Sequence, residues 1–146
     1  MIAELLATLS SALFAGAAIY INLVEHPARM QCGTPLALKE FAPSYKRATV
    51  MQVPLAILGF LSAMAAWLIG SDGRCLIGGI LLVAVVPFTL LVILPTNKKL
   101  LDPTTAGEPD VAERLLIRWG RLHLIRSILS LASLFVFLLV LCSVTK

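Results

Sequence analysis

The side chains best suited to proton transfer in this 146-residue chain are its two histidines, His26 and His123. Glu25 precedes His26 directly, and Arg126 follows His123 by three residues, which is about one helical turn. A histidine can act as a general base near neutral pH, and an arginine can stabilise negative charge that develops on oxygen. These four residues are the candidate catalytic groups, and the chemistry they suit is proton abstraction with stabilisation of the resulting negative charge.

Other polar residues in the same segments are candidates for substrate binding. Asn22, Glu25 and His26 share one face of a helix, and Trp119, His123 and Arg126 share another, because residues three or four apart are neighbours. The candidate substrate-binding residues are Asn22, Tyr45, Arg47, Thr96, Asn97 and Trp119. An alternative interpretation is structural, because long polar side chains and aromatic rings also gather where helices leave a membrane.

The composition shows which elements must position these residues. The chain is 59% hydrophobic and 14% charged, with a mean hydropathy of +0.94. Soluble domains carry about 25% charged residues, so lipid is the natural solvent for this chain. The net charge of +4 does not indicate nucleic-acid binding, because the basic residues form no known motif and no patch interleaved with aromatic residues.

Four apolar segments, each about the 20 residues that a helix needs to cross a bilayer, predict four transmembrane helices. We place these spans at residues 1–24, 49–69, 76–94 and 122–144. They form one domain, 1–146, with an all-α four-helix bundle fold, because backbone groups in lipid must be paired within each segment. Pro27 and Pro95 mark helix breaks after spans one and three, and Pro109 is expected to open a helix leading into span four.

The distribution of lysine and arginine predicts the orientation. Ten of the 12 lie on the side of the two long loops, and only Arg74 and Lys146 lie on the other. By the positive-inside rule the long loops are cytoplasmic and both termini are extracytoplasmic, in a bacterial inner membrane. This topology brings the polar ends of all four spans to the cytoplasmic side, so it predicts one convergent polar site there.

A metal or haem site is an open alternative. His26, His123 and Glu25 could supply a two-histidine, one-carboxylate iron site, or the histidines alone could ligate haem. Adjacent Glu25 and His26 point about 100° apart on a regular helix, so joint ligation would need the break at Pro27. No cofactor is favoured. The cysteines are isolated, and the absence of a CxxC pair excludes a thiol-type quinone reductase and indicates no structural zinc site.

Four short motifs resemble the anthrone oxygenase-like membrane proteins, and they occur in the order and spacing of that family. The motifs are residues 22–29, 44–49, 95–100 and 119–126, and the resemblance covers nearly the whole chain. Most bacterial members have no assigned function, whereas fungal members are associated with oxidation of anthrones to anthraquinones by dioxygen without an added cofactor. The resemblance implies the same class of reaction here, with Glu25, His26, Asn97, His123 and Arg126 as site residues.

Three functions therefore stay open at this point. The first is a cofactor-independent oxygenase or oxidoreductase that acts on a lipophilic phenol, anthrone or quinone-like molecule at the cytoplasmic end of the bundle. The second is the metal or haem protein, and the third is a non-enzymatic membrane protein for binding or assembly. The expected partners are the lipid bilayer and a lipophilic small molecule. Small residues such as Gly16 and Gly59 would also allow helices of two copies to pack as a homo-oligomer.

Overall fold

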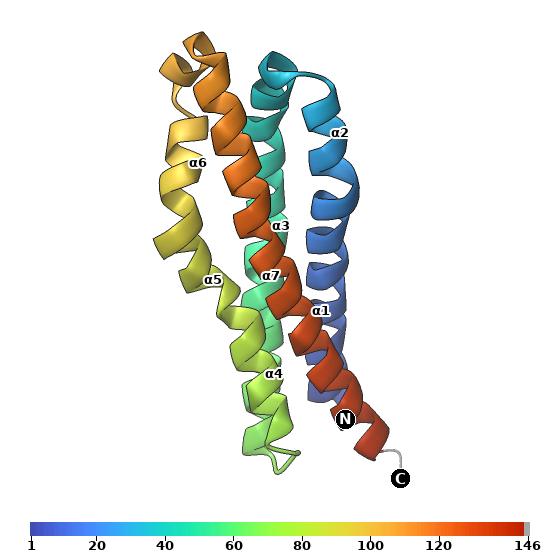
Figure 1. The fold of residues 1–146 in the computed structure, drawn as a ribbon. Coiled ribbons are helices and arrows are strands. Elements are labelled where there is room, and N and C mark those ends of the chain that lie inside the picture. The colour runs from blue at the N-terminus through green and yellow to red at the C-terminus, as the bar shows by residue number, and fades with distance from the viewer. Residues whose placement is uncertain (145–146) are drawn as a thin grey trace.

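The computed structural model describes residues 1–144, and four long helical segments make up nearly all of that range (Figure 1). The first segment comprises α1 (Ile2–Tyr20), the π-helical turn η1 (Ile21–Glu25) and α2 (His26–Gln31). The second is α3 (Thr34–Leu68). The third comprises α4 (Arg74–Val83), α5 (Val85–Phe88), the π-helical turn η2 (Thr89–Ile93) and α6 (Leu94–Leu100). A 3₁₀ turn, η3 (Pro103–Gly107), leads to α7 (Pro109–Val144), which begins at the expected proline.

Each segment is long and apolar enough to cross a membrane. Large apolar side chains such as Leu23, Val50 and Leu91 are exposed on the outside of the bundle, whereas alanine, serine and glycine fill much of the inside. Such a surface is stable in lipid and not in water. The prediction of an all-α, four-helix integral membrane protein is therefore confirmed, while the side of the membrane on which the termini lie stays a prediction.

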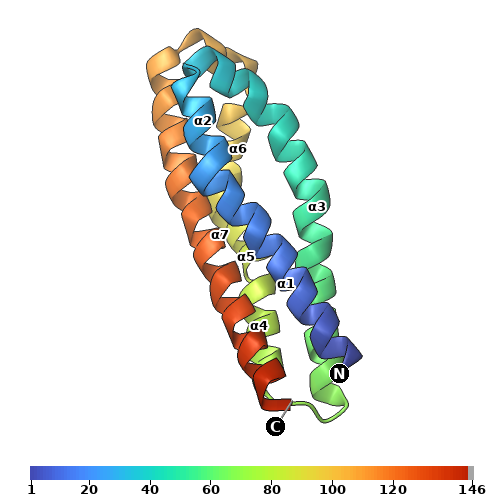
Figure 2. The same ribbon diagram turned by 90° about the vertical axis from the view of Figure 1, so that its right-hand side faces the viewer.

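The start of α1, the end of α7 and the turn between α3 and α4 lie at one end of the bundle, and the α2–α3 connection and η3 lie at the other (Figures 1 and 2). The α3–α4 turn contains Gly70 in the left-handed region, at φ 93°. In the same turn the side-chain and backbone N–H groups of Arg74 donate to Asp72, which lowers the pKa of that carboxyl to about 2. This end is therefore held by local contacts, and the convergent polar residues lie toward the opposite end.

The helices at the polar end are longer than the predicted spans, because Pro27 and Pro95 bend the chain without ending a helix. A π-helical turn precedes each proline: η1 before Pro27 and η2 before Pro95. Proline lacks an N–H and its ring crowds the carbonyl four residues earlier, which a wider turn accommodates. The expected long first loop is thus helical, and only residues 32–33 connect α2 to α3.

The third segment changes direction at Ala84, three residues before Pro87. Before Ala84, α4 packs tightly on α3, since a Cβ at Gly79 would lie 2.7 Å from the Cβ of Ala63. Beyond Ala84, toward the polar end, α5, η2 and α6 diverge from α3 (Figure 1). The backbones of α3 and η2 therefore lie farther apart in the polar half of the bundle than those of α3 and α4 in the other half.

Candidate functional site

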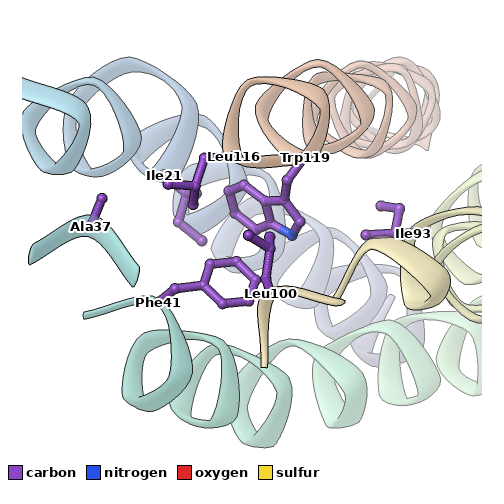
Figure 3. Close-up of a cluster of buried hydrophobic side chains, with 7 residues drawn as sticks. All are labelled: Ile21, Ala37, Phe41, Ile93, Leu100, Leu116 and Trp119. Atoms are coloured by element: carbon purple, nitrogen blue, oxygen red, sulfur yellow. The ribbon is translucent and has the colours of Figure 1, made fainter. Parts of the chain in front are cut away.

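Trp119 of α7 is the centre of the polar half. Its indole is buried in a cluster to which all four segments contribute, and Phe41 of α3 and Ile93 of the third segment lie around it (Figure 3). The indole ring centroid is 5.3 Å from that of His26, 4.8 Å from that of His123 and 5.3 Å from that of Phe41. Both predicted catalytic histidines therefore contact the same indole ring.

His123 is 1% exposed and is held by a hydrogen-bond network from the first segment. Its Nδ1 lies 2.8 Å from Asn22 Oδ1, which also accepts a hydrogen bond from Ser127 Oγ at 2.6 Å. The Asn22 amide nitrogen donates to the carbonyl of Gly120, which fixes the orientation of the amide. Because Asn22 presents its carbonyl oxygen to the ring, the neutral His123 carries its proton on Nδ1, and Nε2 keeps a free lone pair.

His26 packs against the backbone of α7. A Cβ added at Gly120 would lie 2.5 Å from His26 Nε2, so only glycine permits this approach. His26 Nδ1 is buried without a hydrogen-bond partner. No sequence pattern indicated this role of Gly120, because it depends on a neighbour 94 positions away in the chain.

Replacing Gly120 with alanine is expected to push the His26 ring away from α7, because a methyl group at that position overlaps the imidazole. Overpacking of this kind costs about 1 to 3 kcal/mol, so the free energy of unfolding in detergent should fall by that amount. Gly16→Ala is the matched control, because no atom lies within 4 Å of a Cβ at that position. Equal stability of the two variants would contradict the proposed contact.

Glu25 forms an ion pair with Arg29, one turn along the same segment. Arg29 is 5% exposed, and its Nε also lies 2.7 Å from Glu40 Oε2 of α3. Ser44 accepts a hydrogen bond from Arg29 and donates one to Glu25. Neither Arg47 nor Arg126 forms an ion pair with Glu25. This carboxylate therefore ties the first segment to α3.

A cavity of about 90 Å³ lies between these groups. Its lining residues come from all four segments: Phe14, Ile21, Arg29, Phe41, Ser44, Tyr45, Ala48, Thr49, Gln52, Val53, Val85, Val86, Thr89, Leu90, Trp119 and Arg126. The lining is mostly apolar, with a few convergent polar groups, as in small-molecule sites. The volume is below the roughly 300 to 1,000 Å³ of such sites, so binding of a larger molecule requires lining side chains to move. We refer to this space as the Arg126 cavity.

Arg126 supplies a positive charge to this cavity. Its Nη2 donates to Gln52 Oε1 at 2.6 Å, and its guanidinium lies 5.6 Å from the ring centroid of Phe14. Within the described part of the chain no carboxylate pairs with Arg126. Arg126 Nε and Gln52 Nε2 are both buried without partners. A cation at membrane depth with a buried, unused donor is costly unless an anionic or polar group completes its coordination.

The structure places the predicted site residues in three groups. Arg126, Tyr45 and Trp119 line the cavity, and Tyr45 also stacks on Phe41 at 5.9 Å between ring centroids. Asn22, His26 and His123 lie around Trp119 and Gly120, outside the cavity lining.

The third group comprises predicted residues that do not line the cavity either. Thr96 and Asn97 are buried on α6, and Asn97 shares a helical face with Ile93 and Leu100 of the Trp119 cluster. Arg47 is exposed, in an open groove between the first segment and α3 that Glu25 also lines.

Gln52 and Ser44 are functional candidates that the predicted set did not include. Gln52 is 1% exposed, and it lines both the Arg126 cavity and the groove near Arg47. A glutamine within an otherwise charge-free span was the available signal, because polar groups at membrane depth turn toward partners or a cavity. No sequence pattern indicated that Gln52 would meet Arg126.

The arrangement does not assemble the iron site that the sequence left open. Among the described residues no group of three or more histidine, cysteine, aspartate or glutamate side chains could hold a metal ion. Glu25, which would have been the carboxylate ligand, is paired with Arg29.

Comparison with known proteins identifies the family of the chain. Residues 41–136 match the model of the family described as anthrone oxygenase. The chain is 28% identical over 142 residues to anthrone oxygenase tpcL of Aspergillus fumigatus, covering 90% of this chain and 88% of that protein. It is 28% identical over 119 residues to anthrone oxygenase ptaC of Pestalotiopsis fici, covering 68% and 81%.

An anthrone oxygenase of Claviceps purpurea is 43% identical over 67 residues, which are 40% of this chain and 38% of that protein. No solved structure matches the chain. The family model spans more than half of the chain and includes the part of α7 that carries Trp119, His123 and Arg126. This four-helix membrane protein therefore belongs to the anthrone oxygenase family.

Proposed function

We propose that this protein is an oxygenase that uses dioxygen, without an added cofactor, to oxidise a lipophilic anthrone or a related phenolic or quinone-like molecule in the Arg126 cavity. The observation that carries the proposal is the half-buried Arg126 side chain, which lines an apolar cavity and pairs with no carboxylate in the described part of the chain. Such a group can stabilise the negative oxygen of an enolate far better in a dry site than in water. The relatives named as anthrone oxygenases support the choice of substrate class.

The reaction begins with removal of a proton from the substrate methylene carbon, which leaves an enolate whose oxygen faces Arg126. The enolate carbon transfers its electrons to dioxygen and forms a peroxide, which takes up the proton. Loss of one water molecule then gives the ketone, so that CH₂ and O₂ become C=O and H₂O. His123 is the proposed proton acceptor, because its Nε2 keeps a free lone pair.

Trp119 controls this proton transfer, because its indole lines the cavity and also contacts both histidine rings. Neither histidine lines the cavity. Proton transfer to His123 therefore requires the indole to turn when a substrate binds. Catalytic hydrogen bonds are often completed only in the substrate complex.

The substrate reaches the cavity from the bilayer through the space between α3 and η2. Thr49 and Leu90 line the cavity and are also exposed on the lipid-facing surface, which places the mouth between them. The kink above α4 separates η2 from α3 at the same level (Figure 1). A lipophilic molecule dissolved in the membrane would therefore enter sideways.

Leu90→Trp is expected to narrow this mouth and lower kcat/KM for a lipophilic anthrone by about tenfold, equivalent to about 1.4 kcal/mol in the barrier. The kcat should change little, because Leu90 lies at the mouth and not beside Arg126 or Trp119. Leu91→Trp is the control, because Leu91 is 77% exposed and does not line the cavity. Equal kcat/KM values in the two variants would place the mouth elsewhere.

The proposed function is tested by incubating the purified protein, in detergent or nanodiscs, with emodin-type anthrones under air. Oxygen consumption and the absorption of the quinone product should rise together with protein concentration. Absence of protein-dependent turnover across a panel of anthrones and lipophilic phenols would overturn the proposal.

A second candidate function is a non-enzymatic membrane protein that binds a small molecule. One observation favours it: His123, Asn22 and Ser127 form a closed hydrogen-bond network behind Trp119, as a structural core would. In that case loss of His123 should lower the stability of the fold, whereas a catalytic His123 should lower turnover in a protein that stays folded.

The position of the site on the cytoplasmic side of a bacterial inner membrane, and assembly as a homo-oligomer, also belong to this proposal. Cys32 offers a test of the orientation, because it is exposed in the connection between α2 and α3 at the polar end. A membrane-impermeant thiol reagent added to intact cells should not label Cys32, and it should label Cys32 once the membrane is permeabilised and the cytoplasmic side is accessible.

A further inference from the structure

We infer that Gln52 is a specificity-determining residue which, together with Arg126, makes the cavity select ligands that bind as oxygen anions over neutral ligands of the same shape. This inference rests on the proposed function, and it names the charge state and the recognition group of the substrate. It concerns binding, so it can be tested separately from turnover.

The geometry of the pair supports this role. Arg126 Nη2 donates to Gln52 Oε1 at 2.6 Å, so the amide oxygen is used by the arginine and the amide nitrogen is directed elsewhere. Gln52 is 1% exposed and its Nε2 has no partner, and the same is true of Arg126 Nε. Both side chains line the cavity. The site thus offers two unsatisfied N–H donors whose positions are fixed by their mutual hydrogen bond.

The charge of the pair distinguishes it from Arg29. Arg29 is neutralised by ion pairs with Glu25 and Glu40. Arg126 has only the neutral Gln52 amide as a hydrogen-bond partner among the described residues, so its positive charge stays uncompensated. A half-buried cation of this kind favours an anionic ligand, whereas a neutral ligand would leave the charge unpaired.

The ligand chemistry follows from these donors. A phenolate or enolate oxygen could accept from both Arg126 Nε and Gln52 Nε2, while the apolar lining from Phe14, Val85 and Val86 would contact a flat hydrocarbon ring system. A methyl ether of the same molecule keeps the rings but cannot carry the charge. The cavity should therefore discriminate a phenol from its methyl ether.

The test uses 2-hydroxyanthraquinone, whose phenol changes colour on ionisation, and 2-methoxyanthraquinone as the neutral partner. The wild-type protein in detergent should bind the hydroxy probe at least tenfold more tightly than the methoxy probe. The pH at which the bound hydroxy probe takes the phenolate colour should fall by about one to three units, the effect of an opposite charge within reach.

Gln52→Glu is the decisive variant. A glutamate keeps the acceptor for Arg126 and the shape of the side chain, but it neutralises the guanidinium and replaces the free N–H donor with a carboxylate oxygen. It should abolish the preference for the hydroxy probe without lowering thermal stability. Gln52→Leu should also weaken binding of the hydroxy probe, and Ser62→Ala, a buried change elsewhere on α3, should not.

The outcomes separate the two proposals. Equal binding of the two probes, or a hydroxy preference that survives Gln52→Glu, overturns the inference even if the protein oxidises anthrones. A hydroxy preference lost in Gln52→Glu supports the inference even if no anthrone is turned over, and in that case the oxygenase function fails alone.

Discussion

Replacing Arg126 with methionine is expected to reduce the rate of anthrone oxidation by about 10²- to 10³-fold, the usual effect of removing a donor that stabilises a developing oxyanion. Methionine fills similar space between Phe14 and Gln52 but carries no charge and no N–H group. The measurement is kcat for quinone formation in detergent. Oxygen uptake should fall in parallel, because the enolate is the species that reacts with dioxygen.

Loss of folding would not explain this result. Arg126 is half-buried and lacks a counter-charge, so its replacement by an apolar side chain removes an unpaired charge from the bundle, and the free energy of unfolding of Arg126→Met should not fall. Arg121→Met serves as the control, because Arg121 lies on the same helix with an exposed side chain. Turnover of Arg126→Met within a few-fold of the wild type would remove Arg126 from the mechanism.

Replacing His123 with asparagine is expected to lower kcat by about 10²- to 10⁴-fold, the usual contribution of a general base. The asparagine amide can take the place of Nδ1–H and donate to Asn22, but it has no equivalent of the basic Nε2. The hydrogen-bond network around Asn22 and Ser127 should therefore survive. Stopped-flow measurement of enolate formation would show whether proton removal is the step affected.

His26→Gln is the parallel variant, because His26 also contacts Trp119 but its imidazole has no hydrogen-bond partner on Nδ1. A smaller effect than that of His123→Asn would identify His123 as the base. If both variants keep wild-type turnover, neither histidine takes part, and Arg126 alone must promote ionisation of the substrate. A large loss of stability without loss of turnover per folded molecule would favour the structural role.

The sequence by itself determined the membrane class, the number of helices and the end at which the polar residues gather. These follow from hydropathy over about 20-residue windows and from the requirement that backbone groups in lipid be paired, and both are local properties. The ion pair of Glu25 with Arg29 is likewise local, because the two residues are four positions apart on one helical segment. The family motifs pointed to Asn97, His123 and Arg126 for the same reason, since each is carried by a short segment.

Only the tertiary structure decided which of these residues meet. The π-helical turns before Pro27 and Pro95 rotate and extend the segments beyond the expected breaks, a result of steric crowding that hydropathy does not record. The contact of His26 with Gly120, and of Gln52 with Arg126, joins positions 94 and 74 residues apart. Such pairs depend on the packing of whole helices, which short-range spacing does not specify. That packing brings Arg126 to the cavity with Gln52, and it places both histidines behind Trp119.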